Sequence, residues 1–86
     1  MKSLHDRIYE KLVASLKDAR ADAGVTQTEL ASRIGTDQSY VSKYERCERR
    51  LDYVEVRTVC LALGLEPAKF VKAFEDSIRS EKKGGG

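Results

Sequence analysis

Residues 24–45 read GVTQTELASRIGTDQSYVSKYE and contain two short amphipathic segments with a glycine, Gly35, between them. In the first segment Thr26 offers a hydroxyl to cap a helix, and Glu29 three residues later completes the pattern of a capping box. In the second segment Asp37 is suited to cap another helix. The stretch therefore predicts two short helices joined by a turn of a few residues, which makes them cross at a steep angle.

Each of these two helices has a buried and an exposed side. Leu30, Ala31 and Ile34 form the buried side of the first helix, and Val41 and Tyr44 that of the second. The other positions of the second helix hold an unusual number of hydrogen-bonding groups, namely Gln38, Ser39, Ser42, Lys43 and Arg46. A DNA major groove, about 12 Å wide, accepts a helix, and its base edges present distinct donor and acceptor patterns. The second helix therefore has the side chains that sequence-specific contact with DNA requires.

Three more helices are predicted around this pair. The first has an apolar residue every three or four positions and ends at Gly24, its expected left-handed cap; its apolar residues include Leu4, Ile8, Leu12 and Leu16. A fourth helix begins after Asp52 and closes at Gly64, with Val56, Val59, Cys60 and Leu63 on its buried side. A fifth begins at Leu65 and Pro67, with Phe70, Val71, Phe74 and Ile78 on one side. The fold class predicted from these patterns is all-α, with five helices.

The length of the chain limits it to a single domain. Its 86 residues, 41% of them hydrophobic, support one compact core, which we expect over residues 1–80. Residues 81–86 end in three glycines with no apolar residue to anchor them, so a disordered tail is expected there. Because 35% of residues are charged but the net charge is only +2, composition alone does not indicate a partner.

Several function classes are disfavoured by what the sequence lacks. Cys47 and Cys60 stand thirteen positions apart with His5 far from both, a spacing that fits neither a metal site nor a disulfide scaffold. No nucleophile and base form a motif, and no glycine-rich phosphate loop follows a strand, so an enzyme is not expected, nor is a cofactor. No apolar run has the length of a signal core or of a membrane span. We therefore expect a reduced, cytoplasmic, non-membrane protein.

The two blocks GVTQTELA, at residues 24–31, and QSYVSKYE, at residues 38–45, resemble the phage-repressor-like (Cro/C1, Xre) helix-turn-helix family. The resemblance extends over about residues 12–70, and both blocks occur in the family's order and separation. It implies a compact lambda-repressor-like DNA-binding domain whose recognition helix spans about residues 38–46. It also implies a transcription regulator, by preference a repressor, that binds a palindromic operator in double-stranded DNA as a homodimer.

The resemblance assigns roles to residues before the recognition helix. Gln27 matches the family glutamine that hydrogen-bonds a phosphate and braces that helix; its alternative is an exposed first-turn residue. Thr26 is chiefly a cap, with a phosphate contact as a second role. Arg20 and Glu45 match a buried ion pair that ties the first helix to the end of the third, a role in structure rather than binding.

Within the recognition helix the resemblance points to base contacts. The matching positions are Gln38, Ser39, Ser42 and Lys43. A glutamine can pair with adenine and a lysine can donate to guanine, and each such pair contributes about 1–3 kcal/mol of discrimination. The alternative is a solvated helix face. Three roles stay open for Tyr40, which can contact a phosphate or a thymine methyl, or pack its ring on the second helix.

The segment after the recognition helix contains Arg46, Arg49 and Arg50, which the resemblance places near the phosphate backbone. A charge run without such a motif is usually a solvated surface. Cys47 departs from the family, which commonly has glycine there. Either its backbone is left-handed, at a cost of about 1 kcal/mol or more, or the helix continues past it and moves Arg49 and Arg50. A tolerated substitution is preferred for Cys47 over a redox-sensing role.

The apolar stripe of the fifth helix is larger than a small core needs. Phe70 is expected to pack inward, whereas Phe74 and Ile78 are candidates for a dimer interface. The same stripe could serve a different function, that of an antitoxin or other interaction module that binds a partner protein and regulates its own operon.

Overall fold

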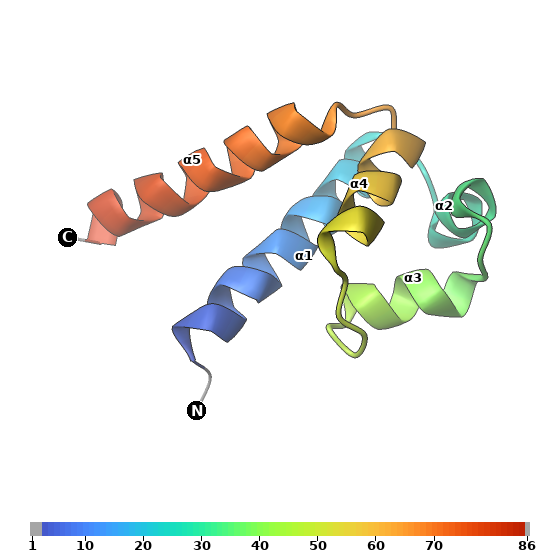
Figure 1. Cartoon of the computed structure of the whole chain (residues 1–86), viewed down its shortest axis with the longest axis horizontal. Coiled ribbons are helices and arrows are strands. Elements are labelled where there is room, and N and C mark those ends of the chain that lie inside the picture. The colour runs from blue at the N-terminus through green and yellow to red at the C-terminus, as the bar shows by residue number, and fades with distance from the viewer. Residues whose placement is uncertain (1–2, 86) are drawn as a thin grey trace.

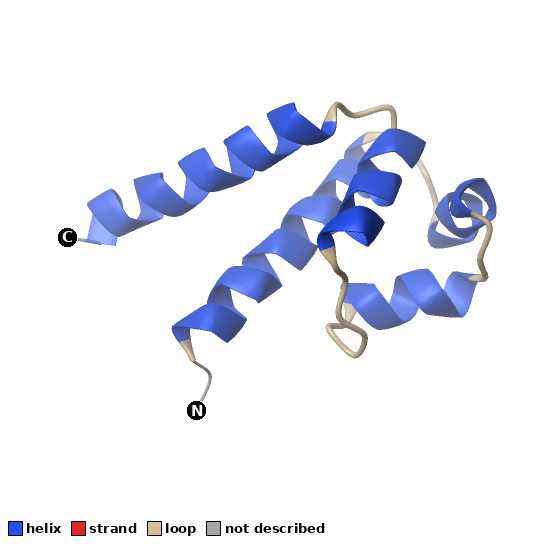
Figure 2. Ribbon diagram, viewed as in Figure 1, coloured by secondary structure: helices blue, strands red, loops and turns tan. Residues whose placement is uncertain are grey.

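The computed structural model describes residues 3–85, and the side chains of residues 3–80. It has five helices: α1 (Leu4–Asp22), α2 (Gln27–Ile34), α3 (Gln38–Glu45), α4 (Tyr53–Ala62) and α5 (Pro67–Gly85) (Figure 1). This described part contains no strand (Figure 2), so the predicted all-α class is confirmed. Helix α2 packs against α3 and α4, while α1 contacts α3 and α5. The second half of α5 extends away from α2 and α3.

Each of the two short helices begins at the cap that the sequence predicts. The Oγ1 atom of Thr26 accepts a hydrogen bond from the backbone N–H of Glu29 at 3.0 Å. Asp37 Oδ1 accepts from the backbone N–H of Tyr40 at 3.1 Å. These bonds satisfy N–H groups that a helix leaves unpaired at its start. They fix where α2 and α3 begin.

The capping box expected at the start of α2 is not complete. The Glu29 carboxylate instead accepts a hydrogen bond from Arg33, one turn later on the same helix, at 3.1 Å. A complete box stands at the start of α4, where Asp52 and Glu55 each accept from the other's backbone N–H, at 2.8 and 3.0 Å. Arg33 offers the Glu29 carboxylate a charged donor. This donor competes with the neutral backbone N–H of Thr26 that would complete the box.

The core lies between the first four helices. The largest fully buried side chains are Leu16, Leu30, Val41, Tyr44, Val59 and Cys60. The predicted burial of Val41, Tyr44 and Cys60 is therefore confirmed. Phe70 packs against this core from α5, as expected. Because Val41 and Tyr44 occupy the inner side of α3, the opposite side of that helix faces away from the protein.

The turn between α2 and α3 depends on Gly35. Its φ is +80° and its ψ +32°, the left-handed conformation, and its N–H bonds the carbonyls of the last turn of α2. A residue with a side chain pays about 1–2 kcal/mol for this backbone conformation. The glycine therefore lets the chain reverse within three residues, and α3 begins at Gln38.

Cys47 adopts the same left-handed conformation, with φ +61°, although it is not a glycine. Helix α3 ends at Glu45, so of the two alternatives left open by the sequence the left-handed backbone is the one observed. The N–H of Cys47 donates to the carbonyl of Tyr44 at 3.0 Å. The Cys47 side chain is exposed. Backbone strain is therefore present directly after α3.

Replacing Cys47 by glycine is expected to raise the free energy of unfolding by about 1 kcal/mol, because glycine adopts this conformation without a Cβ clash. For a domain of this size that change corresponds to a rise in Tm of about 4–8 °C, measurable by thermal unfolding. The matched control is Cys47→Ala, which removes the thiol but keeps the Cβ. An alanine variant stabilised as much as the glycine variant would contradict the explanation.

The last helix is longer than the sequence predicts. Residues 81–85, expected in a disordered tail, continue α5 up to Gly85 in this structure. Glu and Lys at 81–83 are good helix formers, which is consistent with an extension past residue 80. Their side chains and residue 86 lie outside the described residues. Among the described helices, none has the length and hydrophobicity needed to cross a membrane.

Candidate DNA-binding surface

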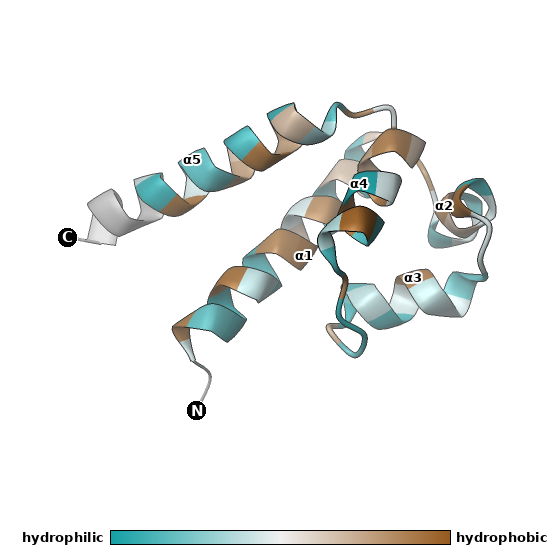
Figure 3. Cartoon of the chain, viewed as in Figure 1, coloured by the Kyte–Doolittle hydropathy of each residue, from teal (hydrophilic) through white to brown (hydrophobic). Residues whose placement is uncertain are grey.

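Helix α3 has one polar, outward-facing side. Gln38, Ser39 and Lys43 are exposed, and Ser42 is partly exposed. In Figure 3 the ribbon of α3 is mostly white and teal, with a short hydrophobic segment. Lys43 makes no hydrogen bond or ion pair with the described side chains, so its ammonium group is available to a ligand. The four side chains that the sequence placed at base-contacting positions are thus accessible together.

A glutamine pair connects α2 to the start of α3. The Nε2 atom of Gln38 donates to Oε1 of Gln27 at 2.7 Å. Gln27 in turn donates from its own Nε2 to Oε1 of Glu45 at 2.8 Å. Gln27 is partly buried and Gln38 is exposed. Gln27 therefore holds both ends of α3, which agrees with the bracing role implied by the resemblance.

The predicted ion pair between Arg20 and Glu45 is confirmed. Arg20 donates from Nε to Glu45 Oε2 at 2.7 Å and from a terminal nitrogen to Oε1 at 3.0 Å. A further bond reaches the carbonyl of Val25 at 2.8 Å. The Glu45 side chain is only 2% exposed. Burial alone would raise the pKa of Glu45, but hydrogen bonds from Arg20 and Gln27 outweigh it and lower this pKa below its usual value.

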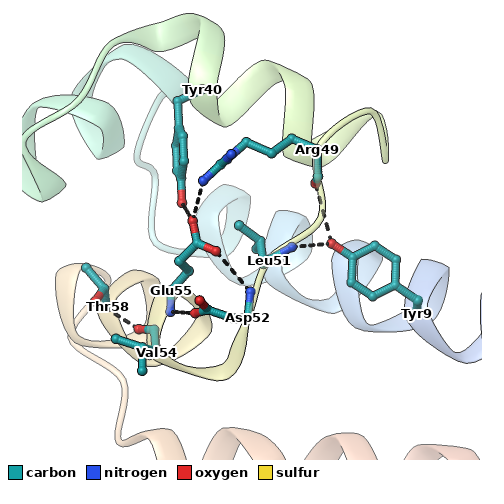
Figure 4. A network of polar contacts seen from close by, with 8 residues as sticks. All are labelled: Tyr9, Tyr40, Arg49, Leu51, Asp52, Val54, Glu55 and Thr58. Atoms are coloured by element: carbon teal, nitrogen blue, oxygen red, sulfur yellow. Dashed lines mark hydrogen bonds and ion pairs between the residues drawn. The ribbon is translucent and has the colours of Figure 1, made fainter.

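Tyr40 points toward α4. Its Oη donates to Glu55 Oε2 at 2.7 Å (Figure 4). Its ring meets that of Tyr44 edge-on, with 5.8 Å between the ring centroids. The guanidinium of Arg49 lies 4.8 Å from the centre of the Tyr40 ring. Burial, followed by the hydrogen bond to Glu55, raises the pKa of Tyr40. The hydroxyl is thus engaged by α4 in the free protein, and contact of Tyr40 with DNA stays a prediction.

Two residues that organise the loop after α3 were missed from the sequence. Glu55 accepts hydrogen bonds from both Tyr40 and Arg49, each at 2.7 Å (Figure 4). The Oη of Tyr9, on α1, accepts from the backbone N–H of Leu51 at 2.8 Å. Tyr9 precedes Leu12 by three positions, a helical spacing that would have placed it on the inner face of α1. Nothing local to Glu55 indicates its two distant partners.

The three arginines after α3 are all exposed and all paired with carboxylates. Arg46 bonds Glu48 at 2.8 and 3.2 Å and also contacts Ser42. Arg50 lies 3.9 Å from Asp6 and stacks over the ring of Tyr9. Ion pairs between exposed side chains are weak, because water and salt screen them.

Comparison with known proteins agrees with this geometry. Residues 11–70 match a family model described as a helix-turn-helix domain. An XRE-family-like protein from Pseudomonas syringae pv. tomato is 42% identical, with a TM-score of 0.82 over 86% of this chain and 90% of that chain. The chain belongs to the XRE-like helix-turn-helix family. The resemblance drawn from residues 24–31 and 38–45 is thereby confirmed.

Two other solved structures similar to this XRE-like chain are regulators. The clp gene regulator ClgR from Corynebacterium glutamicum is 31% identical, with a TM-score of 0.74 over 91% of this chain and 83% of that chain. The restriction-modification controller protein C.Esp1396I is 25% identical, with a TM-score of 0.77 over 90% of this chain and 97% of that chain. No curated protein sequence matches the chain. The fold and family are those of DNA-binding transcription regulators, with α2 and α3 as the helix-turn-helix motif.

Proposed function

We propose that this XRE-like protein is a repressor that binds a palindromic DNA operator as a homodimer, with α3 in the major groove. The observation that carries the proposal is the orientation of α3. Val41 and Tyr44 are fully buried, while the polar side chains of the same helix face solvent. A helix fixed on its inner side and polar on its outer side can enter a groove without rearrangement of the core. Such a regulator acts where its DNA is, in the cytoplasm.

Base contacts are assigned to the exposed side of α3. Gln38 has the amide needed to pair with adenine, and Lys43 has a free ammonium to donate to guanine. Ser39 now donates to Asp37 Oδ1 at 2.8 Å, and Ser42 contacts Arg46. Each hydroxyl can also accept a hydrogen bond from a base edge while keeping its present partner. These four residues form the proposed specificity-determining surface.

Phosphate contacts are assigned to residues around this surface, namely Thr26, Gln27, Arg46, Arg49 and Arg50, and Tyr40 is assigned a contact with either a phosphate or a thymine methyl. The three arginines exchange their carboxylate partners for phosphates, which accept the same fork of N–H donors. The Oγ1 atom of Thr26 accepts from the Glu29 backbone, so its hydroxyl proton remains available to a phosphate. Gln27 has one N–H not used by Glu45. These contacts position α3 without selecting a sequence.

The dimer is assigned to α5. Phe74 and Ile78 are only partly buried and lie on α5 beyond Phe70, which packs against the core. Beside the start of α5 runs a groove of about 860 Å³, lined by charged residues of both signs, among them Asp18, Asp22, Glu66 and Lys69. Paired copies would present two α3 helices to half-sites about 34 Å apart.

Changing both Phe74 and Ile78 to glutamate is expected to convert the dimer to a monomer and to weaken operator binding by at least tenfold, because like charges would face each other across the interface. Sedimentation or light scattering measures the first effect, and a DNA-binding titration the second. Ala68→Glu with Ser80→Glu is the matched control, since it adds the same charge at two exposed positions of α5. If the protein with Phe74→Glu and Ile78→Glu remains a dimer, these two residues do not form the interface.

Selection of binding sites from a random DNA pool tests the function itself. The selected site is expected to contain two inverted half-sites and to bind about 10³-fold or more tighter than a random duplex at the same salt. The logarithm of the affinity should fall with the logarithm of salt by about 0.9 per neutralised phosphate. Equal affinity for selected and random DNA would refute sequence-specific regulation. A selected site with a single half-site would refute the dimer alone.

A second function uses the same α5 stripe. A partner protein could cover Phe74 and Ile78, as in an antitoxin that also regulates its own operon. The partly exposed apolar side of α5 is the feature that favours this alternative. Purification of the full chain from its natural host distinguishes the two, because only this second function requires a different protein in stoichiometric amount.

A further inference from the structure

A single tyrosine of α1 contacts the loop after α3 at three points. The Oη atom of Tyr9 accepts a hydrogen bond from the backbone N–H of Leu51 at 2.8 Å and donates a longer one to the carbonyl of Arg49, at 3.5 Å (Figure 4). A tyrosine hydroxyl has a proton to donate and lone pairs to accept with, so it can make both bonds at once. The ring of Tyr9 lies against the guanidinium of Arg50, whose central carbon is 4.3 Å from the ring centre.

All three contacts act on Arg50. The carbonyl of Arg49 belongs to the peptide group before Arg50, and the N–H of Leu51 belongs to the peptide group after it. Tyr9 therefore bonds both peptide groups that flank Arg50, while its ring supports the side chain between them. One residue of α1 thus restrains the backbone and the guanidinium of Arg50 together.

The polar partners of Arg50 are weaker than those of the other two arginines in this loop. Its guanidinium lies 3.9 Å from the carboxylate of Asp6 and 3.5 Å from Nδ1 of His5, whereas Arg46 and Arg49 each bond a carboxylate, at 2.8 and 2.7 Å. The Arg50 side chain is 56% exposed. A guanidinium that lies over an aromatic ring keeps N–H groups free along its edges, where a phosphate can accept two of them. Arg50 is therefore supported by Tyr9 and open to a phosphate.

Such support affects the strength of phosphate binding. An arginine that moves freely loses much of its side-chain freedom when it binds a phosphate, and this loss weakens the complex. Arg50, already held by Tyr9, has less freedom to lose. The gain is the same on every DNA sequence, because a phosphate contact does not read the bases.

We propose that Tyr9 is a positioning residue for DNA binding, which holds Arg50 in the conformation that contacts a phosphate and does not contact DNA itself. This inference rests on the proposed function, because it assigns how one of the phosphate contacts is prepared. It makes the first half of α1 part of the DNA-binding apparatus, although α1 lies outside the helix-turn-helix motif.

A double-mutant cycle of Tyr9→Leu and Arg50→Gln tests the proposal. Affinities for the selected operator and for a random duplex are measured at several salt concentrations. Arg50→Gln is expected to weaken both complexes by the same factor and to lower the salt slope by about 0.9. Tyr9→Leu is expected to weaken both about fivefold, because the ring no longer supports the guanidinium.

The decisive comparison is the effect of Tyr9→Leu when Arg50→Gln is already present. It should then change either affinity by less than about twofold, because the ring that supports Arg49 is that of Tyr40 and not that of Tyr9. An equal loss in both backgrounds would show that Tyr9 acts through the fold, and it would overturn the proposal. An unchanged affinity of Tyr9→Leu in the wild-type background would overturn it as well.

Two further variants complete the experiment. Tyr9→Phe keeps the ring and loses only the hydroxyl, so it decides the question if Tyr9→Leu does not fold in thermal unfolding. Its expected loss is about threefold, again only when Arg50 is present. Tyr53→Leu is the matched control, because it makes the same change at a tyrosine of α4 that is 60% exposed. It should leave both affinities and the salt slope unchanged.

The outcomes separate this inference from the proposed function. Wild-type protein that binds selected and random DNA equally would refute the function. Wild-type protein that prefers its operator, together with a Tyr9→Leu variant that binds both duplexes as tightly as the wild type, would refute only the role of Tyr9. An Arg50→Gln variant with unchanged affinity would likewise overturn this inference and leave sequence-specific binding in place.

Discussion

Replacing Arg20 by methionine is expected to lower the free energy of unfolding by about 3–5 kcal/mol, because it leaves the buried carboxylate of Glu45 without its charged partner. Methionine retains the apolar stem of the side chain, so the decrease in the free energy of unfolding measures the contribution of the guanidinium group. Denaturant unfolding at neutral pH measures the change. Arg33→Met is the matched control: its pair with Glu29, at 42% and 57% exposed, and its hydrogen bond to the carbonyl of Ala62 both lie at the surface, so their loss should cost only about 1 kcal/mol.

The same variant has a characteristic pH dependence. In the wild type the pKa of Glu45 is lower in the folded than in the unfolded chain, so its contribution to stability is present above the unfolded value, about 4.3, and is lost as pH falls through the folded value. Without Arg20, burial dominates and raises the pKa of Glu45. In the Arg20→Met variant, lowering the pH therefore protonates Glu45 and removes a buried charge that destabilises the folded chain. The difference in stability between the two proteins should therefore narrow toward pH 4, and a constant difference would contradict the assigned cause.

Gln38→Ala and Lys43→Ala are each expected to weaken binding to the selected operator by about 1–3 kcal/mol, roughly tenfold to a hundredfold, because each removes a contact to a base edge. Binding to a random duplex should change much less. Both side chains are exposed, so the free energy of unfolding should stay within about 0.5 kcal/mol of the wild type. Fluorescence titrations with the two DNA types at one salt concentration give the comparison.

The control for these variants is Lys72→Ala, which removes an exposed lysine of α5 that lies outside the lining of the groove beside this helix. It should leave both affinities unchanged. Equal losses on operator and random DNA for Gln38→Ala would assign that residue to the phosphate backbone. A loss confined to the operator would assign it to the bases.

Much of the fold was predictable because its determinants are local. The caps at Thr26 and Asp37 bond N–H groups within three residues, and Gly35 acts on its own backbone. Helical spacing placed Val41 and Tyr44 inside, which by itself turns the polar side of α3 outward. The resemblance to a known family added the Arg20–Glu45 pair, whose members are distant in sequence. These features needed no knowledge of how the helices pack.

Cys47 shows where local information ends. Its sequence environment permits either a left-handed residue or a longer helix, and the left-handed backbone costs a non-glycine residue about 1 kcal/mol or more. In the folded chain α3 stops at Glu45, and Tyr9 holds Leu51 of the following loop against α1. The neighbouring residues leave the backbone conformation of Cys47 undetermined. In the folded chain the left-handed conformation occurs together with the hydrogen bond between Tyr9 and Leu51, which are 42 positions apart.

The amino-acid sequence by itself determined that the chain forms five helices, where α2, α3 and α4 begin, and which side of α3 faces outward, because hydrogen bonds and apolar spacing within a few residues decide those features. Tertiary structure alone decided that the Tyr40 hydroxyl binds Glu55, that Arg50 meets Asp6 of α1, and that Glu45 is linked to Gln38 through Gln27. These contacts join segments far apart in sequence. Their donors and acceptors come within bonding distance only when the buried side chains have set the position of each helix against the others.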